Sequence, residues 1–305
     1  MRQLILATDT PTMAHVALLG CGLMGTPMAL RLLQHGHTLT VWNRTRSKAA
    51  ALTAHGARLA DWPALAVKDA DIVITMLEHG GVVAEVLFGL GEHAAAGGLQ
   101  PGQLVIDMSS ILPEQARDHG QRLEALGVHY LDAPVSGGTV GAEAGTLAIM
   151  AGGAVDQFER ARCVLDVLGR PVHVGPTGSG QLAKLANQMI VGITIGAVAE
   201  ALLMVERGGA DPAKVRQALR GGFAESRIME VHGQRMVDKD FAKRGSLAIQ
   251  LKDLRNALHT AEGMGFDAVI TQHLADLYGQ AAEHGFDQLD QSGLYQELAL
   301  RQKPR

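Results

Sequence analysis

Three glycines lie close together at the junction between an apolar run and a helix-like segment. Residues 20–25 read Gly-Cys-Gly-Leu-Met-Gly, the pattern G-x-G-x-x-G, after the apolar residues 15–19 and before "TPMALRLLQHG". Here Gly20, Gly22 and Gly25 permit a tight turn and let a pyrophosphate approach backbone N–H groups at the start of a helix. The alternative is a tight turn without a ligand, but the strand-then-helix context favours a dinucleotide site.

The second apolar run, "HTLTVWN", ends in Asn43-Arg44-Thr45. In NAD-binding folds an Asp or Glu commonly stands there to accept hydrogen bonds from the adenosine ribose, whereas a 2′-phosphate needs cations and donors. The guanidinium of Arg44 and the hydroxyl of Thr45 therefore predict NADP, with NAD as the second choice and Arg46 and Lys48 as helpers. The alternative is a solvated basic turn.

Two further stretches carry groups suited to a small acid. Ser136-Gly137-Gly138-Thr139 offers a hydroxyl and successive unhindered N–H groups that can hold a carboxylate, although a flexible loop would read the same way. Downstream, Lys184, Asn187 and Gln188 are spaced three and four residues apart and share one helix face. Because desolvation lowers a lysine pKa, Lys184 is a candidate proton donor; the alternative is a surface lysine.

Other chemistries lack their signatures in the sequence. No two of the 13 histidines stand four residues apart, and neither Cys-x-x-Cys nor G-x-S-x-G occurs, so we predict no metal site and no serine nucleophile. By spacing alone, Lys252-Asp253 is an ordinary charged pair on a helix. The net charge of −4 without a basic run argues against nucleic acid and membrane partners.

Alternating strand and helix signals must position these groups. Apolar runs recur between glycine-punctuated helical segments up to "PVHVGPTGSG", which predicts an α/β domain with a mostly parallel sheet over residues 15–178. Residues 179–305 show only helical spacing and predict an all-helical domain. We expect residues 1–14 to be an N-terminal extension without an export signal, of which residues 1–12 are dispensable. The two cysteines indicate a reducing, cytoplasmic setting.

The stretch 189–205 is the most apolar part of the chain. It contains Gly192, Thr194, Gly196 and Glu200 and falls short of the ~20 residues that a membrane span requires. We predict a buried helix there.

The motifs together resemble the β-hydroxyacid dehydrogenase family over nearly the whole chain from about residue 15. The resemblance rests on these segments, in this order and at these separations: "GLMGTPMA", "DMSSILPE", "DAPVSGG", "GSGQLAKLANQ", "LKDL" and "LDQSGL". It implies a Rossmann-type domain and a helical oligomerisation domain joined by a long interdomain helix, in a dimer or tetramer. The implied activity is hydride transfer between NADP(H) and a short β-hydroxy acid or semialdehyde acid, of the 2-hydroxy-3-oxopropanoate or 3-hydroxyisobutyrate type.

The resemblance also implies roles for individual residues. Lys184 would be the catalytic acid/base, Asn187 and Gln188 would orient substrate, and Lys252 would reach both substrate and cofactor. Other groups would hold the substrate carboxylate (Ser136, Gly137, Gly138), the pyrophosphate (Gly20, Gly22, Leu23, Met24, Gly25) and the nicotinamide end (Met76, Leu77, Ser109). The Ala-Asn-Gln at residues 186–188 resembles the tartronate semialdehyde reductase branch, which usually has Pro at Glu78 and His at Gln291.

Competing functions remain at this point. The related 6-phosphogluconate dehydrogenases usually have His at Asn187, and imine reductases lack the lysine and the Ser-Gly-Gly loop. A dehydrogenase acting on another small hydroxy acid is a close alternative. A catalytically silent NADP-binding sensor or scaffold is a different class, against which the intact Lys184 and Ser136 argue.

Overall fold

The computed structural model describes residues 13–302, and the chain divides into two compact units. The first runs to Lys184 and the second begins at Leu185. The predicted N-terminal extension lies outside the described residues except for Met13 and Ala14. Ala14 is buried, and its carbonyl accepts a hydrogen bond from the Thr38 N–H (3.2 Å), so it belongs to the folded part.

The first unit is built on one sheet, whose strands are β1 (His15–Leu19), β2 (Thr38–Trp42), β3 (Arg58–Leu59), β4 (Ile72–Thr75), β5 (Leu104–Asp107), β6 (His129–Asp132), β7 (Val135–Ser136), β8 (Leu147–Gly153) and β9 (Gly169–Gly175). They are ordered β3-β2-β1-β4-β5-β6-β8-β7, and β9 also pairs with β8. Strands β1 to β6 pair in parallel, which confirms the predicted class. Strand β8 instead runs antiparallel to β6 and β7.

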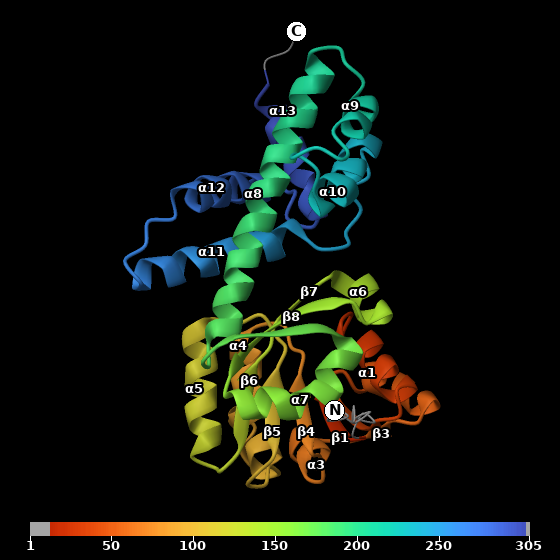
Figure 1. The fold of residues 1–305 in the computed structure, drawn as a ribbon, viewed down its shortest axis with the longest axis vertical. Coiled ribbons are helices and arrows are strands. Elements are labelled where there is room, and N and C mark those ends of the chain that lie inside the picture. The colour runs from red at the N-terminus through yellow and green to blue at the C-terminus, as the bar shows by residue number, and fades with distance from the viewer. Residues whose placement is uncertain (1–12, 303–305) are drawn as a thin grey trace, which may run out of the picture. The chain divides into compact units, whose positions relative to one another are not determined.

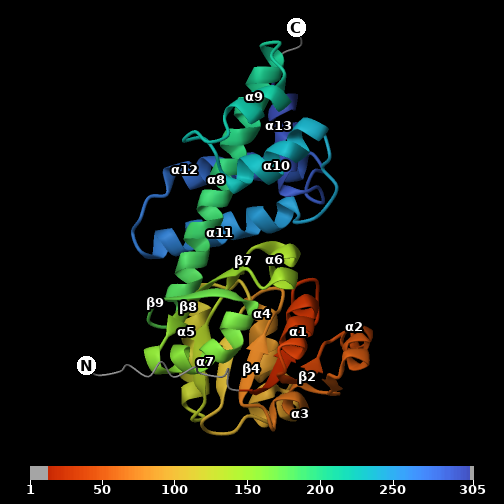
Figure 2. The same cartoon turned by 45° about the vertical axis from the view of Figure 1, so that its right-hand side comes forward.

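Helices cover both faces of this sheet (Figures 1 and 2): α1 (Gly25–Gln34), α2 (Arg46–Ala50), α3 (Pro63–Val67), α4 (Gly80–Ala84), α5 (Pro113–Glu124), α6 (Gly138–Ala144) and α7 (Val155–Leu168). Alternate side chains of β1 enter opposite cores, as the period of a strand requires. Val16 and Leu18 join the core under α1 and α7, whereas Ala17 and Leu19 join the core under α3, α4 and α5.

Short 3₁₀ and π turns complete the connections: η1 (Ala51–His55), η2 (Glu85–Gly89), η3 (Gly91–His93), η4 (Ala95–Gly97) and η5 (Gln291–Gly293). The strand order reverses between β1 and β4, because β1 pairs with β2 on one side and with β4 on the other. In open parallel sheets, ligands bind at the carboxyl ends of the strands beside such a reversal. This position directs attention to the turns after β1, β2 and β4.

The described part of the second unit is all-helical, as predicted. Its helices are the latter part of α8 (Ser179–Arg207) followed by α9 (Pro212–Ala218), α10 (Arg227–Asp238), α11 (Leu247–Gly263), α12 (Val269–Glu283) and α13 (Leu294–Leu300). They enclose one core that includes Leu202, Leu254 and Tyr278. A glycine of positive φ lies two residues after the end of each of α11 and α12, at Gly265 and Gly285.

Helix α8 is longer than the apolar stretch predicted over 189–205. By length and composition alone it could cross a membrane, a test that core helices of soluble proteins also pass; 44% of its most apolar window is buried inside the fold. Ile195 and Leu202 face the core, whereas Ile190 and Met204 are exposed. The prediction of a buried helix therefore holds for one side of α8 only.

Candidate active site

The turn between β1 and α1 is shaped by its glycines. Gly20 has φ +112°, and a β-carbon there would collide with the Met76 carbonyl, while one at Gly25 would collide with the Gly20 carbonyl. Gly22 instead faces open space, and Leu23 is 81% exposed beside it. Gly20 and Gly25 are closely packed, whereas the open face at Gly22 leaves backbone groups accessible to a pyrophosphate. The turn therefore fits a dinucleotide.

Asn43 connects this turn to the end of β2. Its side-chain oxygen accepts a hydrogen bond from the Cys21 N–H (2.9 Å), and its side-chain nitrogen donates to the Thr45 carbonyl (2.9 Å). The sequence assigned Asn43 to cofactor contact; in the structure its amide joins the two loops, and Asn43 also lines the pocket between them. Burial raises the pKa of the neighbouring Cys21 thiol to about 12, which keeps the thiol protonated.

A pocket of about 470 Å³ opens between these loops. Predicted cofactor residues line it, namely Gly20, Gly22, Asn43, Arg44, Thr45, Met76 and Leu77. Asp61 also lines it but is ion-paired with Arg46, whereas Arg44 has no ion-pair partner among residues 13–302. An exposed, uncompensated guanidinium at the end of β2 fits a phosphate on the adenosine side.

The resemblance assigns Ser109 to the nicotinamide end, and the structure places it beside Leu77. It is fully buried, and its hydroxyl accepts a hydrogen bond from the Leu77 N–H (3.0 Å). Ser109 therefore supports the wall that contains Leu77. Met24 and Gly25 likewise lie outside the pocket lining, although Gly25 begins α1.

The predicted carboxylate-binding segment is more ordered than a loop. Ser136 ends β7 and pairs with Ala148, and Gly138 begins α6. Gly137 (φ +140°) and Gly138 (φ +64°) both have backbone conformations that favour glycine, and Gly138 faces open space. The half-buried Ser136 hydroxyl and unhindered glycine backbone are thus presented together.

Lys184 lies near the start of α8 and is 8% exposed. The helix start is held by Asp132 at the end of β6, whose carboxylate accepts hydrogen bonds from the Gly178 N–H (2.7 Å) and the Gln181 N–H (2.8 Å). Burial raises the pKa of Asp132 to about 6 despite these bonds. Lys184 is therefore a buried lysine on a fixed helix end, not a surface lysine.

Asn187 and Gln188 follow on the same helix, within the second unit. The Asn187 amide nitrogen donates to the Gln188 side-chain oxygen (2.8 Å), and the Gln188 amide nitrogen donates to Asp253 (2.7 Å). Lys252 lies 3.1 Å from the other oxygen of Asp253. The buried Asp253 carboxylate thus connects the three predicted substrate residues Asn187, Gln188 and Lys252. From its spacing alone, Asp253 was interpreted as an ordinary charged residue on a helix.

Gln250 strengthens this junction between α8 and α11. Its side chain is fully buried, and its amide nitrogen donates to the Gln188 carbonyl (2.9 Å). A β-carbon at Gly192 would lie 2.6 Å from that nitrogen, so glycine there lets the two helices approach. Lys252 and Asp253 are thereby fixed against Asn187 and Gln188.

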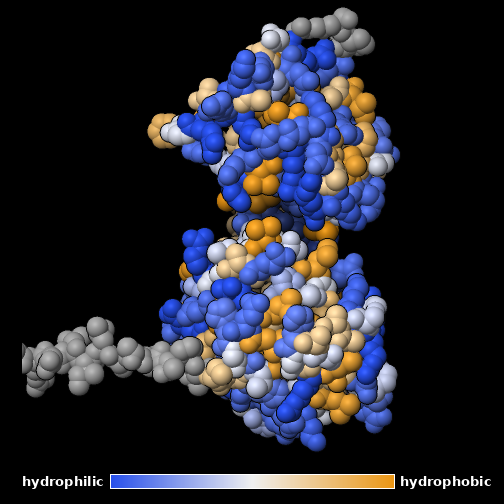
Figure 3. Space-filling model, turned by 90° about the vertical axis from the view of Figure 1, so that its right-hand side faces the viewer, coloured by the Kyte–Doolittle hydropathy of each residue, from blue (hydrophilic) through white to orange (hydrophobic). Residues whose placement is uncertain are grey.

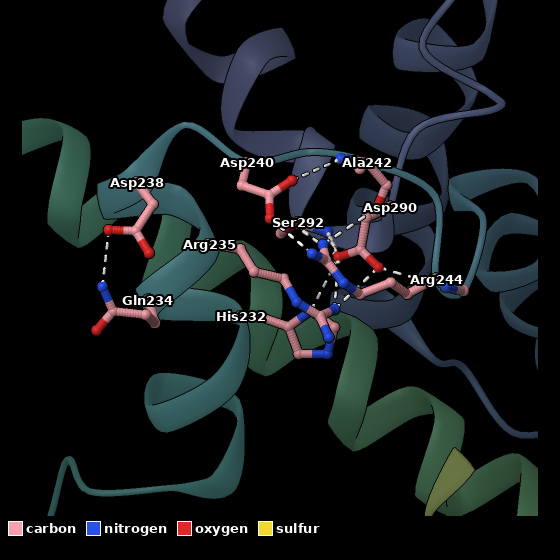
Figure 4. A network of polar contacts seen from close by, with 10 residues as sticks. His232, Gln234, Arg235, Asp238, Asp240, Ala242, Arg244, Asp290 and Ser292 are labelled. Atoms are coloured by element: carbon pink, nitrogen blue, oxygen red, sulfur yellow. Dashed lines mark hydrogen bonds and ion pairs between the residues drawn. The ribbon is translucent and has the colours of Figure 1, made fainter. Parts of the chain in front are cut away.

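The start of α11 is anchored by Asp290 (Figure 4). Its buried carboxylate accepts hydrogen bonds from Arg235 (2.9 Å) and Ser292 (2.7 Å), and His232 lies 3.3 Å away. Burial acts to raise the pKa of Asp290, but these partners hold it well below its usual range. Because the N–H of Gly245 also donates to Asp290 (3.3 Å), the segment leading into α11 is tied to the same carboxylate.

Within residues 13–302, no group of three or more His, Cys, Asp or Glu side chains is placed to hold a metal ion. The groups that could do chemistry are the cofactor pocket, the Ser136 segment and the lysines and amides of α8 and α11.

Comparisons with known proteins match both units. Residues 15–178 match the family described as the NAD binding domain of 6-phosphogluconate dehydrogenase, and residues 178–298 match the NAD-binding family of NADP-dependent 3-hydroxyisobutyrate dehydrogenase. The 2-hydroxy-3-oxopropionate reductase of Escherichia coli (strain K12) is 42% identical over 92% of this chain and 96% of its own. The 3-hydroxyisobutyrate dehydrogenase of Pseudomonas aeruginosa is 35% identical over 89% and 95%.

A solved structure agrees with these matches. Mycobacterium tuberculosis 3-hydroxyisobutyrate dehydrogenase with L-serine has a TM-score of 0.85 and 32% identity, covering 95% of this chain and all of its own. Its likeness extends over both units described above. The chain therefore belongs to the β-hydroxyacid dehydrogenase family of pyridine-nucleotide-dependent oxidoreductases.

Proposed function

We propose that the protein reduces a short aldehyde acid of the 2-hydroxy-3-oxopropanoate type with NADPH, and oxidises the corresponding 3-hydroxy acid in reverse. The observation that carries the proposal is the buried Lys184 on the same helix as Asn187 and Gln188. The E. coli relative, named 2-hydroxy-3-oxopropionate reductase, supports this substrate type over a branched hydroxy acid. The Ala-Asn-Gln at residues 186–188 favours the same type.

The chain's own groups divide the work of binding. Gly20, Gly22, Leu23, Met24 and Gly25 hold the pyrophosphate, Arg44 and Thr45 hold the 2′-phosphate, and Met76 and Leu77 form the nicotinamide wall. Ser136, Gly137 and Gly138 bind the substrate carboxylate through one hydroxyl and the backbone N–H groups. Asn187, Gln188 and Lys252 orient the remaining polar atoms of a substrate only a few carbons long.

Proton transfer is the task of Lys184. When bound, the reduced nicotinamide supplies a hydride to the aldehyde carbon. Negative charge then develops on the former carbonyl oxygen, and Lys184 donates the proton that neutralises it. In the oxidative direction the neutral amine of Lys184 accepts the hydroxyl proton.

The test is NADPH consumption over a panel of short aldehyde acids, with the matching aldehydes that lack a carboxylate as controls. We expect turnover only with the acids, and kcat/KM higher with NADPH than with NADH. Cofactor binding without turnover on any member of the panel would contradict the proposed reaction and favour a silent NADP-binding module.

We also propose that the protein is a cytoplasmic homo-oligomer, a dimer or tetramer, without nucleic acid or membrane partners. Large apolar side chains remain exposed in the second unit, including Ile190, Met204, Val269 and Ile270. Orange apolar areas interrupt the blue surface of both units in Figure 3. Such exposed groups are typical of surfaces that a second copy covers. Sedimentation velocity measures the oligomeric state, and a protein that sediments as a monomer would contradict this proposal.

A further inference from the structure

We propose that Gln181 is a positioning residue, which holds Lys184 in a fixed place relative to the wall formed by Leu77. The inference rests on the proposed function, because it assigns to Gln181 the alignment of the proton donor with the nicotinamide side of the site. Gln181 itself is fully buried and touches neither the pocket nor solvent.

A chain of buried hydrogen bonds makes the connection, all of it within the first unit. The Gln181 amide nitrogen donates to the Ser109 carbonyl (2.9 Å), and the Ser109 hydroxyl accepts from the Leu77 N–H (3.0 Å). The Gln181 amide oxygen accepts from the Ile111 N–H (3.1 Å). Both ends of one amide are thus bound to the segment that follows β5, and that segment is bound to the Leu77 wall.

The backbone of Gln181 is fixed as firmly as its side chain. Its N–H donates to Asp132 (2.8 Å), and a β-carbon at the preceding Gly180 would collide with the carbonyls of Asp132 and Met150. The first turn of α8 consequently has no room to slide along the sheet. Lys184 follows Gln181 by three residues, one turn along the same side of the helix, so a shift of Gln181 is passed on to Lys184.

The chemistry of the contacts requires an amide at this position. A carboxamide donates to one carbonyl and accepts from one N–H, whereas a carboxylate can only accept and a hydrocarbon can do neither. Loss of either bond leaves the Ser109 carbonyl or the Ile111 N–H buried without a partner, which destabilises the present position of the helix start. A misplacement of about 1 Å in a reacting group lowers turnover on the order of 10²-fold.

The experiment compares Gln181→Leu with Gln103→Leu. Gln103 is a matched control because it is also buried and its side-chain amide also binds backbone groups. It donates to the Val67 (2.8 Å) and Ala70 (2.5 Å) carbonyls and accepts from the Gln100 N–H (2.6 Å). Gln103 lies before β5, however, whereas the Ser109 partner of Gln181 lies after it. We expect both variants to lose Tm to a similar extent. Only Gln181→Leu should lower kcat, by roughly 10²-fold, with KM and NADPH affinity nearly unchanged and an altered pH profile of kcat.

Gln181→Glu provides a second variant that keeps the side-chain length and the bond from Ile111 while placing an oxygen against the Ser109 carbonyl. We expect it to lower kcat as Gln181→Leu does. Equal kcat in the Gln181 and Gln103 variants, per folded molecule, would overturn the positioning role while leaving the proposed function intact. Absence of turnover in the unaltered enzyme would contradict the proposed function and this role together.

Discussion

The side-chain oxygen of Asn43, which lines the candidate cofactor pocket, accepts a hydrogen bond from the backbone N–H of Cys21 at 2.9 Å. Through its nitrogen the same amide donates to the Thr45 carbonyl. The glycine turn and the turn that carries Arg44 are therefore held at one spacing by one side chain. We expect cofactor binding to depend on Asn43 through this spacing.

We expect Asn43→Ala to weaken NADPH and NADH by the same factor. Two hydrogen bonds are lost, each with a net contribution of about 0.5–1.5 kcal/mol, so both affinities should fall roughly tenfold or more. Fluorescence titration with the two cofactors measures this directly. A loss confined to NADPH would mean that Asn43 contacts the 2′-phosphate itself.

Arg44→Asp should act on selectivity instead. A charge-assisted bond contributes on the order of 1.5–3 kcal/mol, so removing it and adding a like charge should erase or reverse an NADPH preference of about ten- to a hundredfold. Arg58→Ala is the control, because Arg58 is exposed on β3 and does not line the pocket. Equal kcat/KM for the two cofactors in the unaltered protein would refute the assignment.

Local signals explain how much of the fold could be predicted. The strand ends, the positive φ of Gly20 and the glycine stops at Gly265 and Gly285 depend on residues near one another in the chain, and the sequence pattern contains them.

Contacts between distant residues account for what the sequence could not show. Gln181 and Asp132 lie within the recognised motifs, but their partners are far away in sequence, as with Gln181 and Ser109. Asp253 likewise meets Gln188 only after α8 and α11 pack together. The burial of Ser109 is a property of the assembled sheet, which the resemblance that assigned Ser109 to the nicotinamide end could not show. For Gln181 and Asp253, the sequence signal of a buried contact was the position of a polar residue within an apolar helical pattern.

Protonation of His119 should reduce stability in acid. Burial lowers the pKa of His119, and its Nδ1 has no hydrogen-bond partner among residues 13–302. The neutral form therefore stabilises the fold fully above the unfolded-state pKa of about 6.5, and this stabilisation is lost as pH falls through the lower folded-state pKa. We expect Tm to fall more between pH 7.5 and 5 in the unaltered protein than in His119→Leu.

The comparison of the two proteins isolates His119 from other titrating groups. Asp132 acts in the opposite direction, because its raised pKa means that its stabilisation is lost as pH rises through about 6. That contribution is common to both proteins and cancels in the difference. His55→Leu, at an exposed position, should leave the pH dependence of Tm unchanged. Identical pH dependence in His119→Leu and the unaltered protein would be inconsistent with a buried neutral histidine.

Replacement of Lys184 tests the proton donor itself. Lys184→Ala should lower kcat by at least the ~10²-fold expected from the loss of a positioned acid, while NADPH affinity stays nearly unchanged. Lys214→Ala is the control, because the Lys214 side chain is 84% exposed on α9. Stopped-flow NADPH oxidation and fluorescence titration of the cofactor separate the two quantities.

Lys184→Arg distinguishes proton donation from charge. A guanidinium keeps the positive charge that attracts the substrate carboxylate, but its pKa is too high for it to donate a proton readily near neutral pH. The alkoxide that develops at the aldehyde oxygen would then lack its proton source, so the Arg variant should fail almost as badly as the Ala variant. Near-normal turnover in Lys184→Arg would make Lys184 an electrostatic anchor, and the proton would have to come from bound water or another group.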